Sequence, residues 1–273
     1  MTDEPTPPRR PSTEIDTTTP HQARVWNFLL GGKDYYQVDR ETAEYLEQHI
    51  YPGIKDIALH ARAFLGRAVR YVAEEAEIRQ YLDVGTGLPT ADNTHDVAQR
   101  VDPTSRIVYV DNDPLVLVHA QALLASHPDG ACDYIEADVR DPDAILTHAA
   151  RTLDLTRPIA LMLLGVMGTI TDNDQAYALT RHLMAALPSG SYLILEDGTN
   201  TVKPKEAAEA ANLVDEGQVY DYRLRTPEEI TRFFDGLRLV DPGVVSVSQW
   251  RVESEVFGLP EKVDAYCGVA VKP

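Results

Sequence analysis

The middle of the chain alternates between short, almost wholly apolar runs and longer stretches in which apolar residues recur every three or four positions. The short runs predict strands that are buried on both faces, and the longer stretches predict helices. Alternation at this spacing is typical of βαβ units around a parallel sheet. The expected strands are residues 79–84, 106–111, 132–137, 158–164 and 190–196, and the expected helices are residues 91–100, 113–126, 141–152 and 172–187.

Further elements are expected on both sides of this alternating region. Residues 1–20 hold five prolines and almost no apolar residue, which predicts a disordered tail. We therefore divide the chain into a tail (1–20), an N-terminal helical cap (21–78) and a core (79–273). The cap should contain helices over residues 21–30, 39–50 and 54–72, and the core should end with helices near 203–217 and 226–235 and strands near 237–248 and 263–271.

Tyr81 to Thr90 has the pattern of a strand that ends in an acid and turns sharply into a helix. Asp83 closes the apolar run, and Gly85 and Gly87 follow it. Such a turn brings backbone close enough to touch a ligand. The next apolar run ends in Asp111, where doubly wound sheets place the acid that meets a ribose. The two strands together predict a nucleoside cofactor at the carboxyl ends of a parallel sheet.

The charges around this turn help to choose the nucleoside. A pyrophosphate favours bare helix N-terminal amides with no anion beside them. Here Asp83, Asp92 and Asp96 flank the loop, and no Lys or Arg lies between Arg79 and Arg100. Carboxylates suit a cofactor that carries an α-ammonium and a sulfonium, as S-adenosylmethionine does. An NAD-dependent oxidoreductase is the alternative.

Four stretches match a known family: residues 23–34 (ARVWNFLLGGKD), 64–69 (FLGRAV), 82–93 (LDVGTGLPTADN) and 108–114 (VYVDNDP). Through them the chain resembles the class I S-adenosylmethionine-dependent methyltransferases. More narrowly, it resembles a bacterial family of similar length whose substrates are largely unassigned. The resemblance implies an α/β, Rossmann-like, doubly wound sheet of seven mostly parallel strands, with the last strand antiparallel.

The resemblance also implies roles for three acids. Asp83 would orient the methionine amino group, Asp111 would hold the ribose, and Asp138 would read the adenine amine. Asp113, which precedes a proline, is more typical of a helix N-cap, and the turn that follows Asp138 offers that residue a similar capping role. The expected cofactor-binding residues are Asp83, Gly85, Thr86, Gly87, Asp111, Asn112, Asp138, Val139 and Gly165.

Groups that could act as an acid or a base are few. His21 and Tyr36 are candidates because they lie on the glycine-broken N-terminal segment, which could fold over the cofactor as a lid or simply pack on the core. Arg62 interrupts an apolar helix, and a solvated face explains it equally well. The eight histidines show no metal-binding spacing, so no metal is expected. With no obvious base, a non-catalytic S-adenosylmethionine-binding sensor or scaffold stays an alternative.

Residues 164–168 (LGVMG) stand where the base- and glutamine-N-methylating enzymes of the superfamily carry Asn/Asp-Pro-Pro-aromatic, which counts against amino methylation of nucleic acid. Composition agrees, because 25 Lys and Arg against 43 Asp and Glu give a net charge of −18, which repels phosphate backbones. The nearest basic patch contains Arg223, Arg225, Arg232 and Arg238 and is diluted by acids. We expect a small organic acceptor, such as a natural-product hydroxyl or carboxyl.

The longest uncharged apolar run, Ile159 to Ile170, is too short to span a bilayer, and no signal peptide is evident. Both cysteines lie in apolar, strand-like runs, as buried thiols of a reducing compartment do. A cytoplasmic protein without a membrane partner is therefore expected. The sequence leaves the oligomeric state open.

Overall fold

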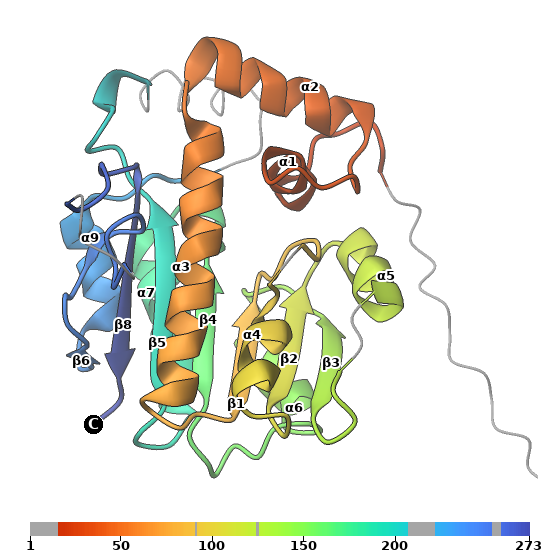
Figure 1. Cartoon of the computed structure of the whole chain (residues 1–273), viewed down its shortest axis with the longest axis vertical. Coiled ribbons are helices and arrows are strands. Elements are labelled where there is room, and N and C mark those ends of the chain that lie inside the picture. The colour runs from red at the N-terminus through yellow and green to blue at the C-terminus, as the bar shows by residue number, and fades with distance from the viewer. Residues whose placement is uncertain (1–15, 91, 124–125, 207–221, 253–257) are drawn as a thin grey trace, which may run out of the picture.

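A central sheet with helices on both faces organises the chain (Figure 1). The computed structural model describes residues 16–90, 92–123, 126–206, 222–252 and 258–273. Seven strands follow the order β3-β2-β1-β4-β5-β8-β6, and a short strand, β7, pairs with β8 off this path. The strands are β1 (Gln80–Val84), β2 (Arg106–Asp111), β3 (Ala131–Glu136), β4 (Ala160–Leu164), β5 (Tyr192–Gly198), β6 (Arg238–Leu239), β7 (Val245–Ser246) and β8 (Ala265–Val271).

Strands β1 to β5 are parallel to one another, and β8 runs antiparallel to its neighbours β5, β6 and β7. Figure 1 shows the parallel strands pointing toward α1 and α2, with β8 pointing away. The seven-stranded, mostly parallel sheet with an antiparallel last strand is thus confirmed.

Burial on both faces explains why the strand sequences are continuously apolar. Leu82 of β1 is paired with Val108 of β2 and Leu161 of β4, and these side chains enter the core on one face. Their sequence neighbours Tyr81 and Ile107 enter the core on the other face. Since consecutive side chains of a strand point to opposite faces, a strand covered on both faces needs apolar residues at every position.

The helices form the two outer layers. One face is covered by α3 (Ile54–Glu74) and α4 (Thr94–Val101), and the other by α6 (Pro142–Ala149), α7 (Asn173–Ala185) and α9 (Pro227–Thr231). Helix α5 (Pro114–Leu123) packs beside β2 and β3. Helices α1 (Gln22–Leu29) and α2 (Gln37–Tyr45), continued by a π-helical turn (Leu46–Ile50), lie over the carboxyl ends of the parallel strands (Figure 1). No helix among the described residues is long and apolar enough to cross a membrane.

The C-terminal part departs from the expected elements at one place. The strand expected near 237–248 is two two-residue strands, β6 and β7, because Asp241-Pro242-Gly243 forms a turn between them. Pro242 has no N–H to donate, and Gly243 adopts a φ of +86°. The helix expected near 203–217 lies mostly outside the described residues, as does most of the expected tail.

Candidate functional site

A cavity of about 940 Å³ lies at the carboxyl ends of the parallel strands and is also lined by residues of α1. It lies where the strand order reverses between β1 and β4, which is where open α/β sheets bind ligands. The lining includes all nine residues expected to bind the cofactor: Asp83, Gly85, Thr86, Gly87, Asp111, Asn112, Asp138, Val139 and Gly165.

The two glycines of the turn after β1 serve different purposes. The Gly85 and Thr86 amides donate to the Val110 carbonyl at 2.8 and 3.2 Å, which fixes the turn to β2. Gly85 has a φ of +76°, and a Cβ there would stand 2.5 Å from the Val166 Cβ. Gly87 has a φ of +67° with nothing within 4 Å of such a Cβ. Gly85 is therefore dictated by packing within the protein, whereas Gly87 borders open space.

Asp83 is buried at the end of β1, only 4% exposed, and its Oδ2 accepts a 2.6 Å hydrogen bond from the Thr94 hydroxyl. Burial raises the pKa of Asp83 to about 6, although Thr94 and the positive charge of Arg62 favour the carboxylate. Arg62 reaches the cavity from α3 and donates to the Asn93 Oδ1 at 3.0 Å. The site is therefore less purely acidic than the local sequence around the turn predicts.

Asp111 at the end of β2 is held by backbone amides. Its Oδ2 accepts from the Gly87 amide at 2.9 Å and its Oδ1 accepts from the Asp113 amide at 3.0 Å, while burial raises its pKa. Asp113 Oδ1 accepts from the Leu115 amide at 2.9 Å, which is the helix-capping role expected for it. Asp113 therefore caps the helix, as the sequence predicts, and Asp111 faces the cavity.

Asp138 lies at the rim of the cavity. Its side chain is 38% exposed and pairs with Arg140 at 3.2 Å, and the Asn112 amide donates to it at 3.3 Å. The cap of α6 is Asp141, whose Oδ1 accepts from the Ala144 amide at 3.1 Å. Asp138 therefore does not cap α6, although its Oδ1 accepts from the Arg140 amide at 2.8 Å within the turn that follows it.

Helix α1 roofs the cavity and is tied to its rim. Gln22 Nε2 donates to the Gly165 carbonyl at 3.2 Å. His21 lines the cavity, with its Nδ1 3.1 Å from Asp113 Oδ2, which places it on the Asp111 side. Tyr36 does not line the cavity: it packs in a small apolar cluster with Leu88, and the Arg24 guanidinium lies 5.3 Å from its ring. The structure thus brings only His21 of the two candidates to the site.

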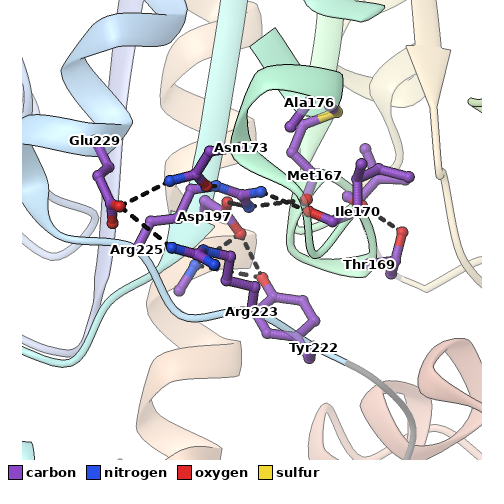
Figure 2. A network of polar contacts seen from close by, with 12 residues as sticks. Met167, Thr169, Ile170, Asn173, Ala176, Asp197, Tyr222, Arg223, Arg225 and Glu229 are labelled. Carbon is purple, nitrogen blue, oxygen red and sulfur yellow. Dashed lines mark hydrogen bonds and ion pairs between the residues drawn. The ribbon is translucent and has the colours of Figure 1, made fainter.

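A buried ion pair supports the part of the cavity wall that contains Tyr222 (Figure 2). Arg225 is fully buried and donates to Asp197 Oδ2 at 2.7 Å and to the Met167 and Ile170 carbonyls at 2.8 and 2.6 Å. Asp197 Oδ1 accepts from the Tyr222 hydroxyl at 2.7 Å. The sequence groups Arg225 with a surface basic patch, whereas the structure makes it the anchor of the segment that carries Tyr222 into the cavity wall.

Glu196 is a lining residue to which sequence reasoning gave no role. It lies near the end of β5 and is 5% exposed. Burial, together with the neighbouring Asp197, raises its pKa to about 8. The sequence does contain a sign of this position, because Glu196 follows an apolar run just as Asp83 and Asp111 do.

Comparisons with known proteins agree with this geometry. A family model described as S-adenosyl methyltransferase matches residues 8–273. The crystal structure of a DUF574 family protein from Streptomyces avermitilis MA-4680 is 43% identical, with a TM-score of 0.90 over 95% of this chain and 100% of that one. A Thermobifida fusca YX protein, provisionally assigned as a methyltransferase, is 41% identical, with a TM-score of 0.85 over 94% of this chain and 96% of its own.

More distant structures share the fold alone. Magnesium protoporphyrin IX methyltransferase from Synechocystis PCC 6803, crystallised with S-adenosylmethionine, is 12% identical, with a TM-score of 0.51 over 91% of this chain and 97% of that one. No curated protein matches the sequence. The family model covers nearly the whole chain and two relatives exceed 40% identity, so the chain belongs to the S-adenosyl methyltransferase family and is an S-adenosylmethionine-dependent methyltransferase.

Proposed function

We propose that the chain binds S-adenosylmethionine in the cavity at the carboxyl ends of the parallel strands and methylates a small organic acceptor there. The observation that carries this proposal is the meeting of Asp83, Asp111 and Asp138 with the glycine turn on one cavity at the sheet's switch point. We assign Asp83 to the α-ammonium, Asp111 to the ribose hydroxyls, and Asp138 with Asn112 and Val139 to the adenine. Gly87 and Thr86 supply backbone along the nucleoside, and Gly165 borders the methyl end.

Unpartnered polar atoms support a polar ligand at this place. Thr90 Oγ1 and Asn27 Nδ2 are buried, belong to lining residues, and have no hydrogen-bond partner among the described residues. Each carboxylate oxygen of Asp111 accepts one hydrogen bond from a described residue, which leaves lone pairs for ligand hydroxyls. Since buried polar groups are normally paired, these atoms fit a molecule with hydroxyls, an amine and a carboxylate. When bound, S-adenosylmethionine supplies a methyl group attached to a positively charged sulfur.

The rest of the cavity suits a small acceptor. The volume of the whole cavity lies near the upper end of the range for ligand pockets. Apolar side chains from the segment that contains α1 to α3 line the part that we do not assign to the cofactor. The protein's task in methyl transfer is to align the acceptor and exclude water, so we propose that the cap (residues 21–78) encloses the acceptor over the core (79–273). The net charge of −18 favours a small molecule over nucleic acid. The free cysteines Cys132 and Cys267 favour a cytoplasmic location.

Replacing Asp111 with Asn should weaken the binding of S-adenosylhomocysteine by about 10- to 100-fold, since hydrogen bonds to a charged group contribute about 1.5–3 kcal/mol. Isothermal titration calorimetry measures this, with melting temperatures to confirm folding. Asp235→Asn, at an exposed position outside the cavity, is the matched control and should bind like the wild type. Equal affinity in all three proteins, or binding of NAD in place of S-adenosylhomocysteine, would refute the proposed cofactor site.

The affinity for S-adenosylhomocysteine should fall as the pH is lowered through about 6. Asp83 has a pKa of about 6 in the free protein, and only its carboxylate form attracts the α-ammonium. The raised pKa of Asp111 adds to the loss at lower pH. The Asp83→Asn variant should bind S-adenosylhomocysteine more weakly than the wild type at pH 8. Its affinity should also change less than that of the wild type between pH 7 and pH 5.5. A wild-type profile that is flat over this interval would remove Asp83 from the binding site.

A further inference from the structure

The part of the cavity outside the assigned cofactor residues is lined by apolar side chains and by buried carboxyls. The apolar residues come from the segment that contains α1 to α3 and include Trp26, Leu46, Ile54 and Leu65. The carboxyls belong to Glu196 and Asp264, both at most 5% exposed. A buried carboxyl can recognise a polar hydrogen on an otherwise apolar acceptor.

The two carboxyls differ in the hydrogen bonds that they accept from the protein. Asp264 accepts hydrogen bonds from the Val202 and Lys203 amides and from the Tyr51 hydroxyl. Asp197, next to Glu196 in the chain, is paired with Arg225. The side-chain carboxyl of Glu196 has no hydrogen bond or ion pair with any residue in the described part of the chain. Burying a carboxyl without a hydrogen-bond partner costs free energy. A ligand that enters the cavity and donates a hydrogen bond to Glu196 would offset that cost.

Glu196 also lies beside the methyl end of the proposed cofactor site. The Gly165 amide donates to the Glu196 carbonyl at 2.9 Å, across adjacent strands β4 and β5. A Cβ placed on Gly165 would stand 3.5 Å from Glu196 Oε2, so this carboxyl oxygen lies over the bare Cα of Gly165. An acceptor atom at that point would touch both Glu196 and the group to be transferred.

We propose that Glu196 is the general base of the reaction and that the acceptor is a neutral, largely apolar alcohol or phenol, an inference that rests on the proposed function. The hydroxyl oxygen of the acceptor forms the new bond to the methyl carbon with one of its lone pairs. The sulfur–methyl bond breaks and its electron pair stays on sulfur, which becomes neutral. The hydroxyl proton passes to a carboxylate oxygen of Glu196. The products are the methyl ether, S-adenosylhomocysteine and protonated Glu196, so charge and atoms balance.

The surroundings of Glu196 suit this role. A base whose pKa of about 8 lies near neutral pH can accept a proton and then release it to water between turnovers. Tyr222 and Cys267 also face Glu196, and burial raises both of their pKa values well above the usual ones, so they stay neutral while Glu196 titrates. Among the residues that the structure describes, Asp197 on the same strand is the group whose charge acts on Glu196, and it is held by Arg225.

The same carboxylate selects against charged acceptors. In the unprotonated form that acts as the base, Glu196 would repel a carboxylate or phosphate acceptor, which disfavours the carboxyl acceptor that the sequence leaves open. The lining arginines do not reverse this, since Arg62 lies near Asp83, Arg140 pairs with Asp138, and Arg223 pairs with Glu229. A neutral hydroxyl can instead donate its proton to Glu196 as a hydrogen bond in the bound complex.

The test compares the wild type with Glu196→Gln and with Glu136→Gln. Glu136 also lies at a strand end, but it is exposed and outside the cavity lining, so its variant is the matched control. Each protein is incubated with S-adenosylmethionine and a panel of naphthols, phenylphenols and naphthylmethanols, together with the corresponding carboxylic acids and amines. Methyl transfer is followed by mass spectrometry between pH 6 and pH 9.5. Infrared titration of carboxyl groups and calorimetric binding of S-adenosylhomocysteine provide readouts that need no turnover.

We expect transfer to hydroxyl compounds, at a rate that rises with pH through about 8 to a plateau, because the base must be unprotonated. Glu196→Gln should lower the rate by about 10²- to 10⁴-fold, remove the carboxyl that titrates near pH 8, and leave S-adenosylhomocysteine affinity within about twofold. Glu136→Gln should match the wild type in all three measurements.

The inference is overturned if Glu196→Gln keeps the wild-type rate and pH profile, or if its infrared titration equals that of the wild type. Transfer only to the acids or amines, or to none of the hydroxyl compounds, also overturns it. In all these cases intact S-adenosylhomocysteine binding would leave the proposed function standing, whereas loss of that binding in the wild type would refute the proposed function itself.

Discussion

Replacing Gly85 with alanine should destabilise the protein by about 2–5 kcal/mol and lower its melting temperature by roughly 10 °C. The left-handed φ of +76° disfavours any residue with a Cβ, and that Cβ would stand 2.5 Å from the Val166 Cβ. Because Gly85 carries the turn that presents Thr86 and Gly87 to the cavity, any folded variant should also bind S-adenosylhomocysteine more weakly. Calorimetric melting and binding measure the two effects.

Two further variants separate the causes. Gly66→Ala, in the interior of α3, has nothing within 4 Å of its new Cβ and should gain up to about 1 kcal/mol. Adding Val166→Gly to Gly85→Ala removes the close contact but keeps the unfavourable φ, so we expect partial recovery. If Gly85→Ala melts at the temperature of Gly66→Ala, the turn tolerates a side chain and its glycine is not dictated by packing.

The parts of the site that the sequence predicts are those set by local chain geometry. A parallel strand ends at the same sheet edge as its neighbours, so acids that directly follow apolar runs, such as Asp83 and Asp111, must converge. Glycine spacing and a residue before proline are equally local signals, which is why the turn after β1 and the capping role of Asp113 follow from the sequence. Each of these features depends on fewer than about six consecutive residues.

The parts that the sequence does not predict depend on pairs distant in the chain. The positive charge of Arg62 acts on Asp83 from α3, and the sequence of the glycine turn does not predict a cation next to Asp83. Arg225 belongs to a charged stretch, and only the fold shows that it is buried against Asp197. The role that we propose for Glu196 depends on the hydrogen bonds of the neighbouring carboxyls, since Asp197 and Asp264 are paired and the Glu196 carboxyl is not. A strand-end acid can be read from sequence, but its partner cannot.

Replacing Arg225 with methionine should lower the free energy of unfolding by about 3–5 kcal/mol, because one partner of a buried ion pair is left without the other. Of its donors in the described part of the chain, Asp197 would keep the Tyr222 hydroxyl and the Gly198 amide, and the Met167 and Ile170 carbonyls would each lose one donor. Urea denaturation measures the loss. Arg223→Met, two residues away and partly exposed in its pair with Glu229, is the matched control and should cost at most about 1 kcal/mol.

The pH dependence of this loss identifies its cause. Burial already raises the pKa of Asp197, and removing the guanidinium should raise it further. A group whose pKa is higher in the folded state stabilises the fold below its unfolded pKa, and that contribution is lost as the pH rises through the folded value. The deficit of Arg225→Met should therefore grow from about pH 4 to pH 8, and Asp197→Asn in the same chain should remove most of this growth. A deficit independent of pH would have a different cause, namely the hydrogen bonds that the Met167 and Ile170 carbonyls lose. Those bonds, and not the pairing of the Asp197 carboxylate, would then hold the segment that carries Tyr222 into the cavity wall.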